Sequence, residues 1–344
     1  MSLARRAPVS PGFSCHNVLM ETRQGRKISY VFPVFNESGN ITLLHTQVSR
    51  VVATLAYEVE FVYVNDGSTD DSLELLLELR KRDDRIVVVD FARNYGHQIA
   101  VTAGLDVATG DAVIIMDSDL QDPPAVSLEL VARWEEGWDV VYAQRRTRKD
   151  SAFKRATASL FYKTLRAVSE VDIPPDTGDF RLIDRRVVDE LKKFTERDRF
   201  LRGMVSYVGF KQTAVQFDRD ERHAGSSKYP LGAMIRFAAD GVLGFSTYPL
   251  KLISRIGFLA AALSVVGILY TLAVKIFVPE IVVAGWTFIV ISILLMGGLQ
   301  LIMLGILGSY VGRIYRQVQN RPLYAVNAVH SKHPLDASRI DDLD

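Results

Sequence analysis

The chain has 344 residues, 48% of them hydrophobic, which is enough to build one large domain with additional elements. Its 41 basic and 40 acidic side chains nearly cancel, and a formal net charge of +1 gives no overall electrostatic footprint for nucleic acid. The single cysteine, Cys15, excludes an intramolecular disulfide framework and a cysteine-based zinc motif.

Residues 1–27 carry five basic side chains among proline, serine and glycine, without the apolar segment of a secretory signal. We expect a basic, flexible lead-in that either lies against anionic lipid or is a solvated tail. The folded part of the chain is then expected to begin at residue 28.

From residue 28 to residue 143, short apolar runs alternate with stretches of helical spacing. The predicted strands are 28–32, 61–64, 86–91, 112–116 and 139–143. The predicted helices are 41–55, 73–79, a stretch that ends at 108, and 126–136. Ser68 or Thr69 is the expected N-cap of the second helix. This alternation predicts a doubly wound, mostly parallel α/β sheet.

Polar residues follow the predicted strands at the point where each strand ends. In open α/β sheets, ligands bind outside the carboxyl ends of the strands. Those ends present Glu37, Asp66, Asn94, Asp117 and Asp119. The first strand is followed neither by G-x-G-x-x-G nor by G-x-x-x-x-G-K-[ST], which disfavours a dinucleotide oxidoreductase and a P-loop enzyme.

The acidic loop at 117–122 is the centre of the predicted site, because an apolar strand ends there in two carboxylates one residue apart. Asp117, Asp119 and Gln121 offer oxygen ligands of the kind that hold Mg²⁺ or Mn²⁺ together with substrate phosphates and waters. A lone Asp-x-Asp is also common in turns, so the surrounding chain has to decide between the two interpretations. Since phosphate-binding glycine loops are missing, a metal held by acids is the favoured means of neutralising a diphosphate.

The charge changes sign after the fifth predicted strand, where residues 144–149 and 154–155 are rich in arginine and lysine. Arginine forks match phosphate geometry, so a second anionic group could bind there; the alternative is a solvated basic loop. Further along, Asp179 lies between a glycine and a phenylalanine, and residues 222–229 form a Gly/Ser stretch with flanking cations.

The last third of the chain contains two apolar runs, 256–277 and 281–311, and both exceed the roughly 20 residues that span a bilayer. Basic residues flank the pair on its outer sides, which places both flanks and the large domain in the cytoplasm by the positive-inside rule. Residues 231–250 predict amphipathic helices on the membrane surface, and from residue 320 we expect a loose, polar tail. Glycines in the second run either face lipid or allow close packing between subunits.

Five ordered motifs of this chain resemble the inverting glycosyltransferases of family 2. They are residues 32–37, 64–70, 93–96, 116–124 and 177–181. With residues 225–229 and the two apolar runs, the chain is most similar to the bactoprenol glucosyltransferase branch, which is related to dolichol-phosphate mannose synthase. The resemblance covers residues 28–325. It implies a glycosyltransferase A type of fold, a nucleotide-sugar donor, usually a UDP-hexose, and a polyprenyl-phosphate acceptor.

The resemblance also implies roles for individual residues. The nucleotide-sugar site would comprise Pro33, Phe35, Glu37, Asp66 and Asp117. The metal and diphosphate site would comprise Asp117, Asp119 and Gln121. The acceptor phosphate would be bound by Arg145, Arg155 and Lys228. Asp119 and Asp179 would be the catalytic residues, with Asp179 either a base or a positioning group. His97 departs from the family's usual lysine, which leaves its contact open.

The implied reaction is inverting transfer of a hexose, with glucose from UDP-glucose preferred, to a polyprenyl phosphate such as undecaprenyl phosphate. The product would be a donor for cell-envelope glycosylation. One alternative is a processive polysaccharide synthase, although Gln-x-x-Arg-Trp is missing and two spans are too few for a channel. Another is a non-catalytic lipid-carrier or flippase accessory protein.

The resemblance and the patterns above divide the chain into five expected parts. They are the lead-in 1–27, a cytoplasmic glycosyltransferase domain 28–230, interfacial helices 231–252, a transmembrane hairpin 253–312 and a cytoplasmic tail 313–344. The protein is expected in the inner membrane, in contact with lipid, with both termini cytoplasmic, and as a homo-oligomer such as a tetramer.

Overall fold

The computed structural model describes residues 26–146, 177–218, 248–277 and 286–332. The lead-in up to residue 25 and the predicted interfacial helices at 231–247 lie outside these ranges. Arg155 and Lys228, two of the predicted acceptor residues, also lie outside the described residues.

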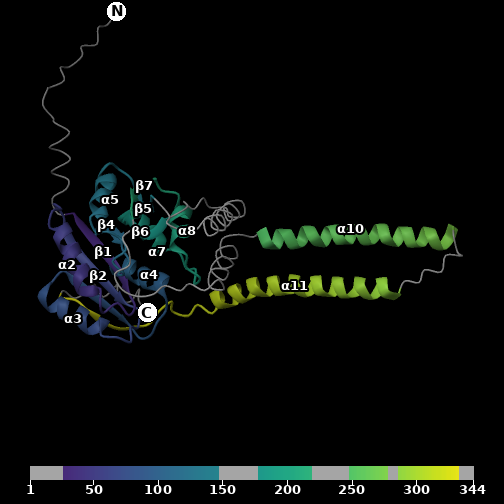
Figure 1. Cartoon of the computed structure of the whole chain (residues 1–344), viewed down its shortest axis with the longest axis horizontal. Helices are drawn as coiled ribbons and strands as arrows, with labels where there is room; N and C mark the ends of the chain where they lie inside the picture. The colour runs from purple at the N-terminus through teal and green to yellow at the C-terminus, as the bar shows by residue number, and fades with distance from the viewer. Residues whose placement is uncertain (1–25, 147–176, 219–247, 278–285, 333–344) are drawn as a thin grey trace, which may run out of the picture.

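Within the described residues, one eight-stranded sheet forms the centre of the fold, and helices cover both of its faces (Figure 1). The strand order is β7-β5-β6-β4-β1-β2-β3-β8. The strands are β1 (Lys27–Val34), β2 (Glu58–Asn65), β3 (Ile86–Phe91), β4 (Ala112–Ile115), β5 (Val140–Arg145), β6 (Thr177–Asp184), β7 (Gln212–Phe217) and β8 (Val326–His330). The helices are α2 (Ile41–Val52), α3 (Ser72–Arg82), α4 (His97–Val107), α5 (Val126–Glu135), α7 (Arg185–Lys192), α8 (Leu201–Val208), α10 (Tyr248–Phe277) and α11 (Trp286–Val318).

The core has two layers because successive side chains of a strand point to opposite faces of the sheet. On β1, Tyr30 and Phe32 pack in the layer under α2, α3 and α5, whereas Val31 packs in the layer under α4, α7 and α8. β1 pairs in parallel with both β2 and β4, and β2 pairs in parallel with β3. The prediction of a doubly wound, mostly parallel α/β sheet is confirmed.

Strand β6 was not predicted. It lies between β4 and β5, so β5, the fifth predicted strand, does not pair with β4. Strand β6 runs antiparallel between β4 and β5, with Val113 opposite Ile183 and Val141 opposite Leu182. Because β6 is antiparallel, its first residues lie at the edge of the sheet where β1 and β4 end. Asp179 is thereby brought to the carboxyl edge of the parallel strands.

The predicted N-cap of the second helix is wrong. Helix α3 begins at Ser72, and Asp71 occupies the N-cap position. The Ser68 hydroxyl instead accepts a hydrogen bond from the backbone N–H of Asn36 at 3.0 Å, and the Thr69 N–H donates to the Asn36 side chain at 2.8 Å. These groups tie the loop after β2 to the loop after β1.

Helices α10 and α11 run side by side, away from the sheet (Figure 1). Among the described residues, one helical stretch, Leu295–Val318, is long and apolar enough to cross a membrane. Both helices expose large apolar side chains, for example Phe258 and Leu263 on α10 and Leu301 on α11. One of the two expected spans is therefore found as a candidate, and the crossing of a membrane by α10 and α11 stays a prediction.

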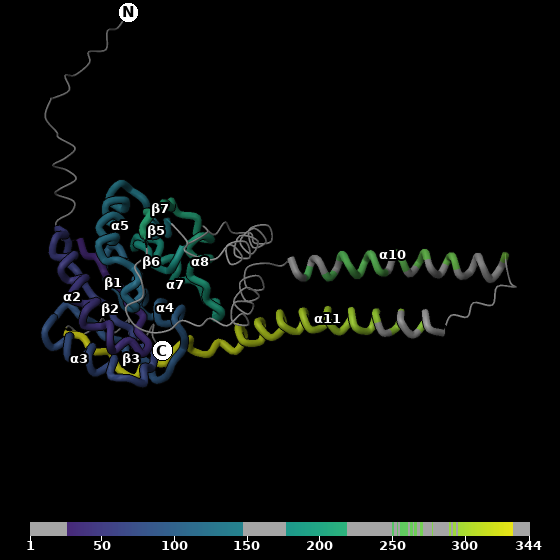
Figure 2. The backbone as a smooth tube through the Cα atoms, in the orientation of Figure 1, coloured from purple at the N-terminus to yellow at the C-terminus, as the bar shows by residue number. Residues whose placement is uncertain are grey.

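The expectation of a loose tail from residue 320 is wrong for the residues that follow α11. The backbone returns from α11 to the edge of the sheet (Figure 2), where β8 pairs antiparallel with β3. Tyr324 is buried, with 5% of its surface exposed. An unpaired β3 edge would leave backbone N–H and C=O groups without strand partners, and β8 pairs with this edge.

Gly104 allows α4 to approach β1 closely, since a Cβ atom at this position would lie 2.2 Å from Cγ1 of Val31. We predict that Gly104→Ala overpacks this contact and costs about 1–3 kcal/mol of stability. Thermal unfolding of the detergent-purified protein would show a lower Tm. Gly39→Ala is the control, because nothing lies within 4 Å of a Cβ atom there. Equal Tm values for the two variants would contradict this packing.

Candidate active site

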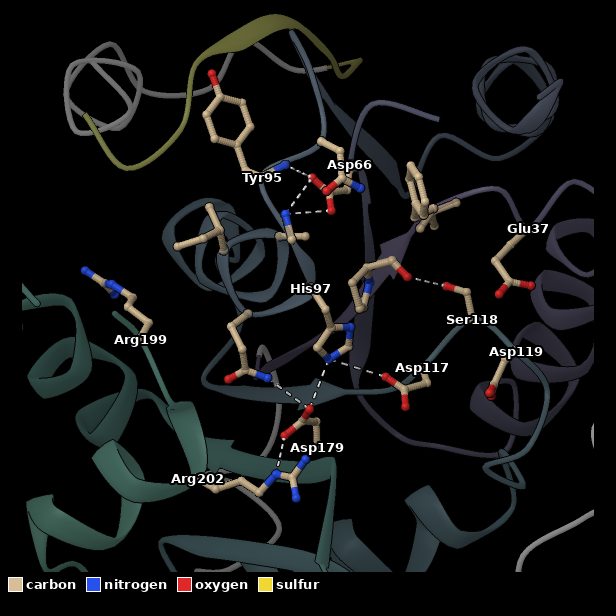
Figure 3. Close-up of a pocket in the computed structure, with 18 of the residues that line it drawn as sticks. Glu37, Asp66, Tyr95, His97, Asp117, Ser118, Asp119, Asp179, Arg199 and Arg202 are labelled. Atoms are coloured by element: carbon tan, nitrogen blue, oxygen red, sulfur yellow. Dashed lines mark hydrogen bonds and ion pairs between the residues drawn. The ribbon is translucent and has the colours of Figure 1, made fainter. Parts of the chain in front are cut away.

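A cavity of about 860 Å³ opens at the carboxyl ends of β1, β2 and β4 (Figure 3). Most of the predicted site residues line it, although they come from distant parts of the sequence. They are Pro33, Phe35, Glu37, Asp66, Asp117, Asp119 and Asp179. The structure therefore gathers the predicted nucleotide and catalytic positions, and two of the three predicted metal ligands, into one pocket.

Gln121 and Arg145 are not part of the cavity lining. The Gln121 backbone N–H donates to Asp119 Oδ1 at 3.1 Å, so this residue shapes the acidic loop. Arg145 lies beside the strand that carries Asp179, because a Cβ atom at Gly178 would be 3.6 Å from its Nη2. Arg145 thus lies next to the Gly178 backbone, beside Asp179, which lines the pocket.

The loop after β1 presents an exposed aromatic ring at the pocket. Phe35 is 46% exposed, although it is a large apolar side chain. The turn at Asn36 has a φ of 54°, a left-handed conformation that asparagine tolerates better than most residues. Glu37 follows, and its carboxylate accepts a hydrogen bond from the Asn40 side chain at 2.6 Å. A fixed turn of this kind offers Phe35 as a flat, apolar surface.

Asp66 lies at the end of β2 and holds the loop that precedes α4. Its carboxylate accepts the backbone N–H of Tyr95 at 2.6 Å and that of Gly96 at 3.0 Å. Burial raises the pKa of Asp66 above its ordinary value, and the two N–H groups oppose this shift by stabilising the anion. Gly67 is required beside it, because its φ is 64° and a Cβ atom would lie 2.4 Å from the Arg93 carbonyl carbon.

The acidic loop follows β4, and Ser118 fastens it to the end of β1. The hydroxyl of Ser118, which lies between Asp117 and Asp119 in the sequence, donates to the Pro33 carbonyl at 2.8 Å (Figure 3). Among the described residues, no group of three or more His, Cys, Asp and Glu side chains is arranged to hold a metal ion. Two carboxylates on one loop do fit a cation of the Mg²⁺ type, which takes its other ligands from substrate phosphates and water.

Asp179 is held by side chains from two different helices (Figure 3). Gln98 donates to its Oδ2 at 3.1 Å, and Arg202 Nε donates to its Oδ1 at 2.9 Å. His97 Nε2 lies 3.0 Å from Oδ2. Burial alone would raise the pKa of Asp179, but the hydrogen bond from His97 and the charge of Arg202 hold it well below its usual range. Asp179 is therefore an ionised and weakly basic carboxylate.

His97, whose contact the sequence left open, bridges two acids of the pocket. Besides Asp179, its Nε2 lies 3.7 Å from Asp117 Oδ1. Burial lowers the pKa of His97, but the hydrogen bond to Asp179 and the charge of Asp117 outweigh this effect and raise it. This raised pKa favours the protonated imidazole between Asp179 and Asp117, the predicted catalytic and metal positions.

The sequence did not identify Gln98 or Arg202 as site residues. Gln98 follows the 93–96 motif by two residues and could have been found from it. Arg202 lies at the start of α8, in the mixed charged stretch 196–202, which carries no pattern that distinguishes it. Its Nη1 also donates to the Thr177 carbonyl at 2.9 Å, so Arg202 fixes both the backbone and the side chain of this end of β6.

Comparisons with known proteins identify the family of this chain. The family model described as Glycosyl transferase family 2 matches residues 29–192. The chain is 46% identical to the uncharacterized glycosyltransferase YkcC of Bacillus subtilis (strain 168), over 87% of this chain and 92% of the relative. It is 41% identical to the bactoprenol glucosyl transferase of Shigella phage SfII, over 90% of this chain and 100% of the relative.

Among solved structures, the chain is similar to glucosyl-3-phosphoglycerate synthase from Mycobacterium tuberculosis in complex with Mn²⁺, UDP-glucose and phosphoglyceric acid. The identity is 22% and the TM-score is 0.45, with 69% of this chain and 85% of that chain covered. The curated relatives are more closely similar, since their identity of 40% or more extends over nearly their whole length. The chain therefore belongs to glycosyltransferase family 2 and is a glycosyltransferase.

Proposed function

We propose that this glycosyltransferase transfers glucose from UDP-glucose to a polyprenyl phosphate such as undecaprenyl phosphate, with inversion at the anomeric carbon. The observation that carries the proposal is that Asp117 and Asp119 line the same pocket as Asp179 and its partner His97. A relative with 41% identity that is named a bactoprenol glucosyl transferase supports the choice of sugar and acceptor.

The donor is proposed to bind on the β1, β2 and β4 side of the pocket. Phe35 and Pro33 would contact the base, since an exposed ring at a fixed turn suits stacking. Asp66 and Glu37 would complete the nucleotide site. Asp66 would act through the Tyr95 and Gly96 backbone that it fixes.

We propose a divalent cation, Mg²⁺ or Mn²⁺, at the acidic loop, held by Asp117, Asp119 and Gln121. When bound, such an ion offsets the charge that develops on the departing diphosphate. The donor set supports this assignment, because carboxylates and amides are ligands that both ions accept. Ser118 contributes by holding the loop against the Pro33 carbonyl.

In the proposed reaction, an oxygen of the acceptor phosphate forms a bond to the anomeric carbon while the bond from that carbon to the diphosphate oxygen breaks. A phosphate monoester has a second pKa of about 6 and is largely anionic at neutral pH, so it needs little help from a base. The low pKa of Asp179 suits a positioning role, in which the carboxylate orients the sugar or the acceptor. His97 and Arg202 fix its direction.

The acceptor phosphate is proposed to bind Arg145, Arg155 and Lys228. Arg145 lies next to Gly178, and this position supports its role beside Asp179. Arg155 and Lys228 are assigned from the family resemblance alone, because both lie outside the described residues. Guanidinium forks suit this task, since each can donate two parallel hydrogen bonds to a phosphate.

We further propose that α10 and α11 both cross the inner membrane, within a hairpin at 253–312, and that the catalytic domain at 28–230 is cytoplasmic. The exposed apolar side chains on both helices support this topology. Arg313 and Arg316 near the end of α11 fit the cytoplasmic side by the positive-inside rule. The cytoplasmic segment 313–344 contains β8, and the glycines of α11 leave room for a homo-oligomer such as a tetramer.

The proposed reaction is tested by supplying the detergent-purified protein with undecaprenyl phosphate, Mg²⁺ or Mn²⁺, and a panel of radiolabelled nucleotide sugars. We predict that label from UDP-glucose passes into the organic phase. Asp119→Ala should abolish the transfer, whereas Asp189→Ala on the exposed face of α7 should not change it. Hydrolysis that leaves the label in water would contradict the acceptor, and absence of any turnover would favour a non-catalytic accessory protein.

The role of Asp179 is tested by the pH dependence of Asp179→Asn. Since its pKa lies well below the usual range, the wild-type carboxylate keeps its charge from pH 6 to pH 8. We predict that the variant loses activity about 100-fold, as expected for misplacement of reacting groups, and by the same factor at both pH values. A loss at pH 6 that is rescued at pH 8 would show that Asp179 removes a proton.

A further inference from the structure

We propose that the segment that follows α11, residues 324–327, positions the nucleotide-binding side of the pocket, with Tyr324 and Asn327 as its positioning residues. They act on the β3–α4 loop, residues 92–96, which presents the Tyr95 and Gly96 backbone to Asp66. The inference rests on the proposed binding of a nucleotide sugar in this pocket. It adds a part of the chain beyond the membrane helices to the donor site.

The first contact is made through the backbone. Strand β8 pairs antiparallel with β3, and Val326 lies opposite Phe91, the last residue of β3. One residue further, the Ala92 N–H donates to the Ala325 carbonyl at 3.0 Å. The segment therefore extends the sheet pairing into the first residue of the β3–α4 loop.

The second contact is a chain of aromatic rings. Tyr324 stacks on Phe91 with ring centroids 5.0 Å apart, and Phe91 contacts Tyr95 edge to face at 5.5 Å. The Tyr324 hydroxyl donates to Asp106 Oδ2 on α4 at 2.9 Å. One buried side chain thus joins the strand before the loop to the helix after it. Figure 3 shows the C-terminal strand passing close to Tyr95.

The third contact is polar and leads directly to Asp66. Asn327 Nδ2 donates to Asp90 Oδ2 at 2.8 Å, and Asn65 Nδ2 donates to Asp90 Oδ1 at 2.7 Å. Asp90 is buried, so loss of either hydrogen bond would leave a buried carboxylate oxygen without that donor, which costs free energy. Asn65 is the neighbour of Asp66 in the chain. The aromatic and polar contacts therefore meet at the Asp66–Tyr95 hydrogen bond.

The loop has little room to adjust if these contacts change. Its Arg93 and Asn94 backbone packs so closely on Gly67 that a single Cβ atom would overlap it. Movement of the loop would therefore alter the Asp66 hydrogen bonds and the pocket lining together. In addition, α11 ends at Val318 and β8 begins at Val326, so a short connection links the membrane helix to the donor site.

The test measures UDP binding by isothermal titration calorimetry with the full-length protein in detergent and Mg²⁺, together with KM and kcat for UDP-glucose. We expect Tyr324→Ala to raise the Kd for UDP and the KM for UDP-glucose roughly 5- to 10-fold, a factor typical of coupling between sites. The kcat and the KM for the acceptor should stay the same. Tyr324→Phe keeps the ring stack and loses only the bond to Asp106, so its effect should be smaller.

Val329→Ala is the matched control, because Val329 belongs to the same strand but pairs with Val89, away from the loop. It should lower Tm by less than Tyr324→Ala does, because Val329 is only partly buried and loses fewer atoms, and it should leave the Kd for UDP unchanged. Asn327→Ala provides a second variant that removes no core packing, and it should also raise the Kd.

Unchanged Kd values in Tyr324→Ala and Asn327→Ala, with only a lower Tm as in Val329→Ala, would reduce the segment to a structural role and overturn the inference. If Tyr324→Ala does not fold, Asn327→Ala alone decides in the same way. Absence of UDP binding in the wild type would overturn the proposed donor, and the inference with it. These failures are distinguishable because only the last one affects the wild-type protein.

Discussion

The arrangement of this enzyme depends on holding six carboxylates in one pocket. The acids that line it are Glu37, Asp66, Asp117, Asp119, Asp179 and Asp198, and like charges in one pocket repel unless they are compensated. Neighbouring groups compensate several of these charges. Backbone N–H groups stabilise Asp66, and Arg202 stabilises Asp179. His97 lies between Asp179 and Asp117. A proposed cation at the acidic loop would add the positive charge that a diphosphate requires. With such a cation, the pocket could receive an anionic diphosphate although its own lining is rich in acids.

Sheet topology explains how this charge pattern arises. The parallel strands β1, β2 and β4 end at one edge of the sheet, and the loops that follow them carry the proposed donor-binding residues. Antiparallel β6 starts at the same edge and places Asp179 there. The two halves meet where β4 pairs with β6 in the centre of the sheet. Helix α8 then completes the site, because Arg202 binds both the Asp179 carboxylate and the Thr177 carbonyl. Donor and acceptor groups can therefore be positioned by separate elements on one rigid frame.

The parallel half of the fold could be predicted from the sequence because its strands are apolar runs followed by helical spacing. Asp117 and Asp119 could be predicted because they end such a run. Strand β6 could not, since its pairing with β4 and β5 is a long-range contact and its start resembles a loop around Asp179. The same holds for β8 and Arg202, whose roles depend on tertiary contacts. Ser68 and Thr69 have the chemistry of helix caps, but the structure uses them to join two loops.

The measurement that tests charge compensation most directly is the affinity of the wild-type protein for UDP, by isothermal titration calorimetry, with Mn²⁺ and with EDTA. If Asp117 and Asp119 hold a cation that receives the diphosphate, removal of the cation leaves two anions facing each other. We predict that UDP binds at least about tenfold more weakly in EDTA, in keeping with the several kcal/mol that such an ion supplies. Equal affinity under the two conditions would contradict the proposed metal site and the role of the acidic loop.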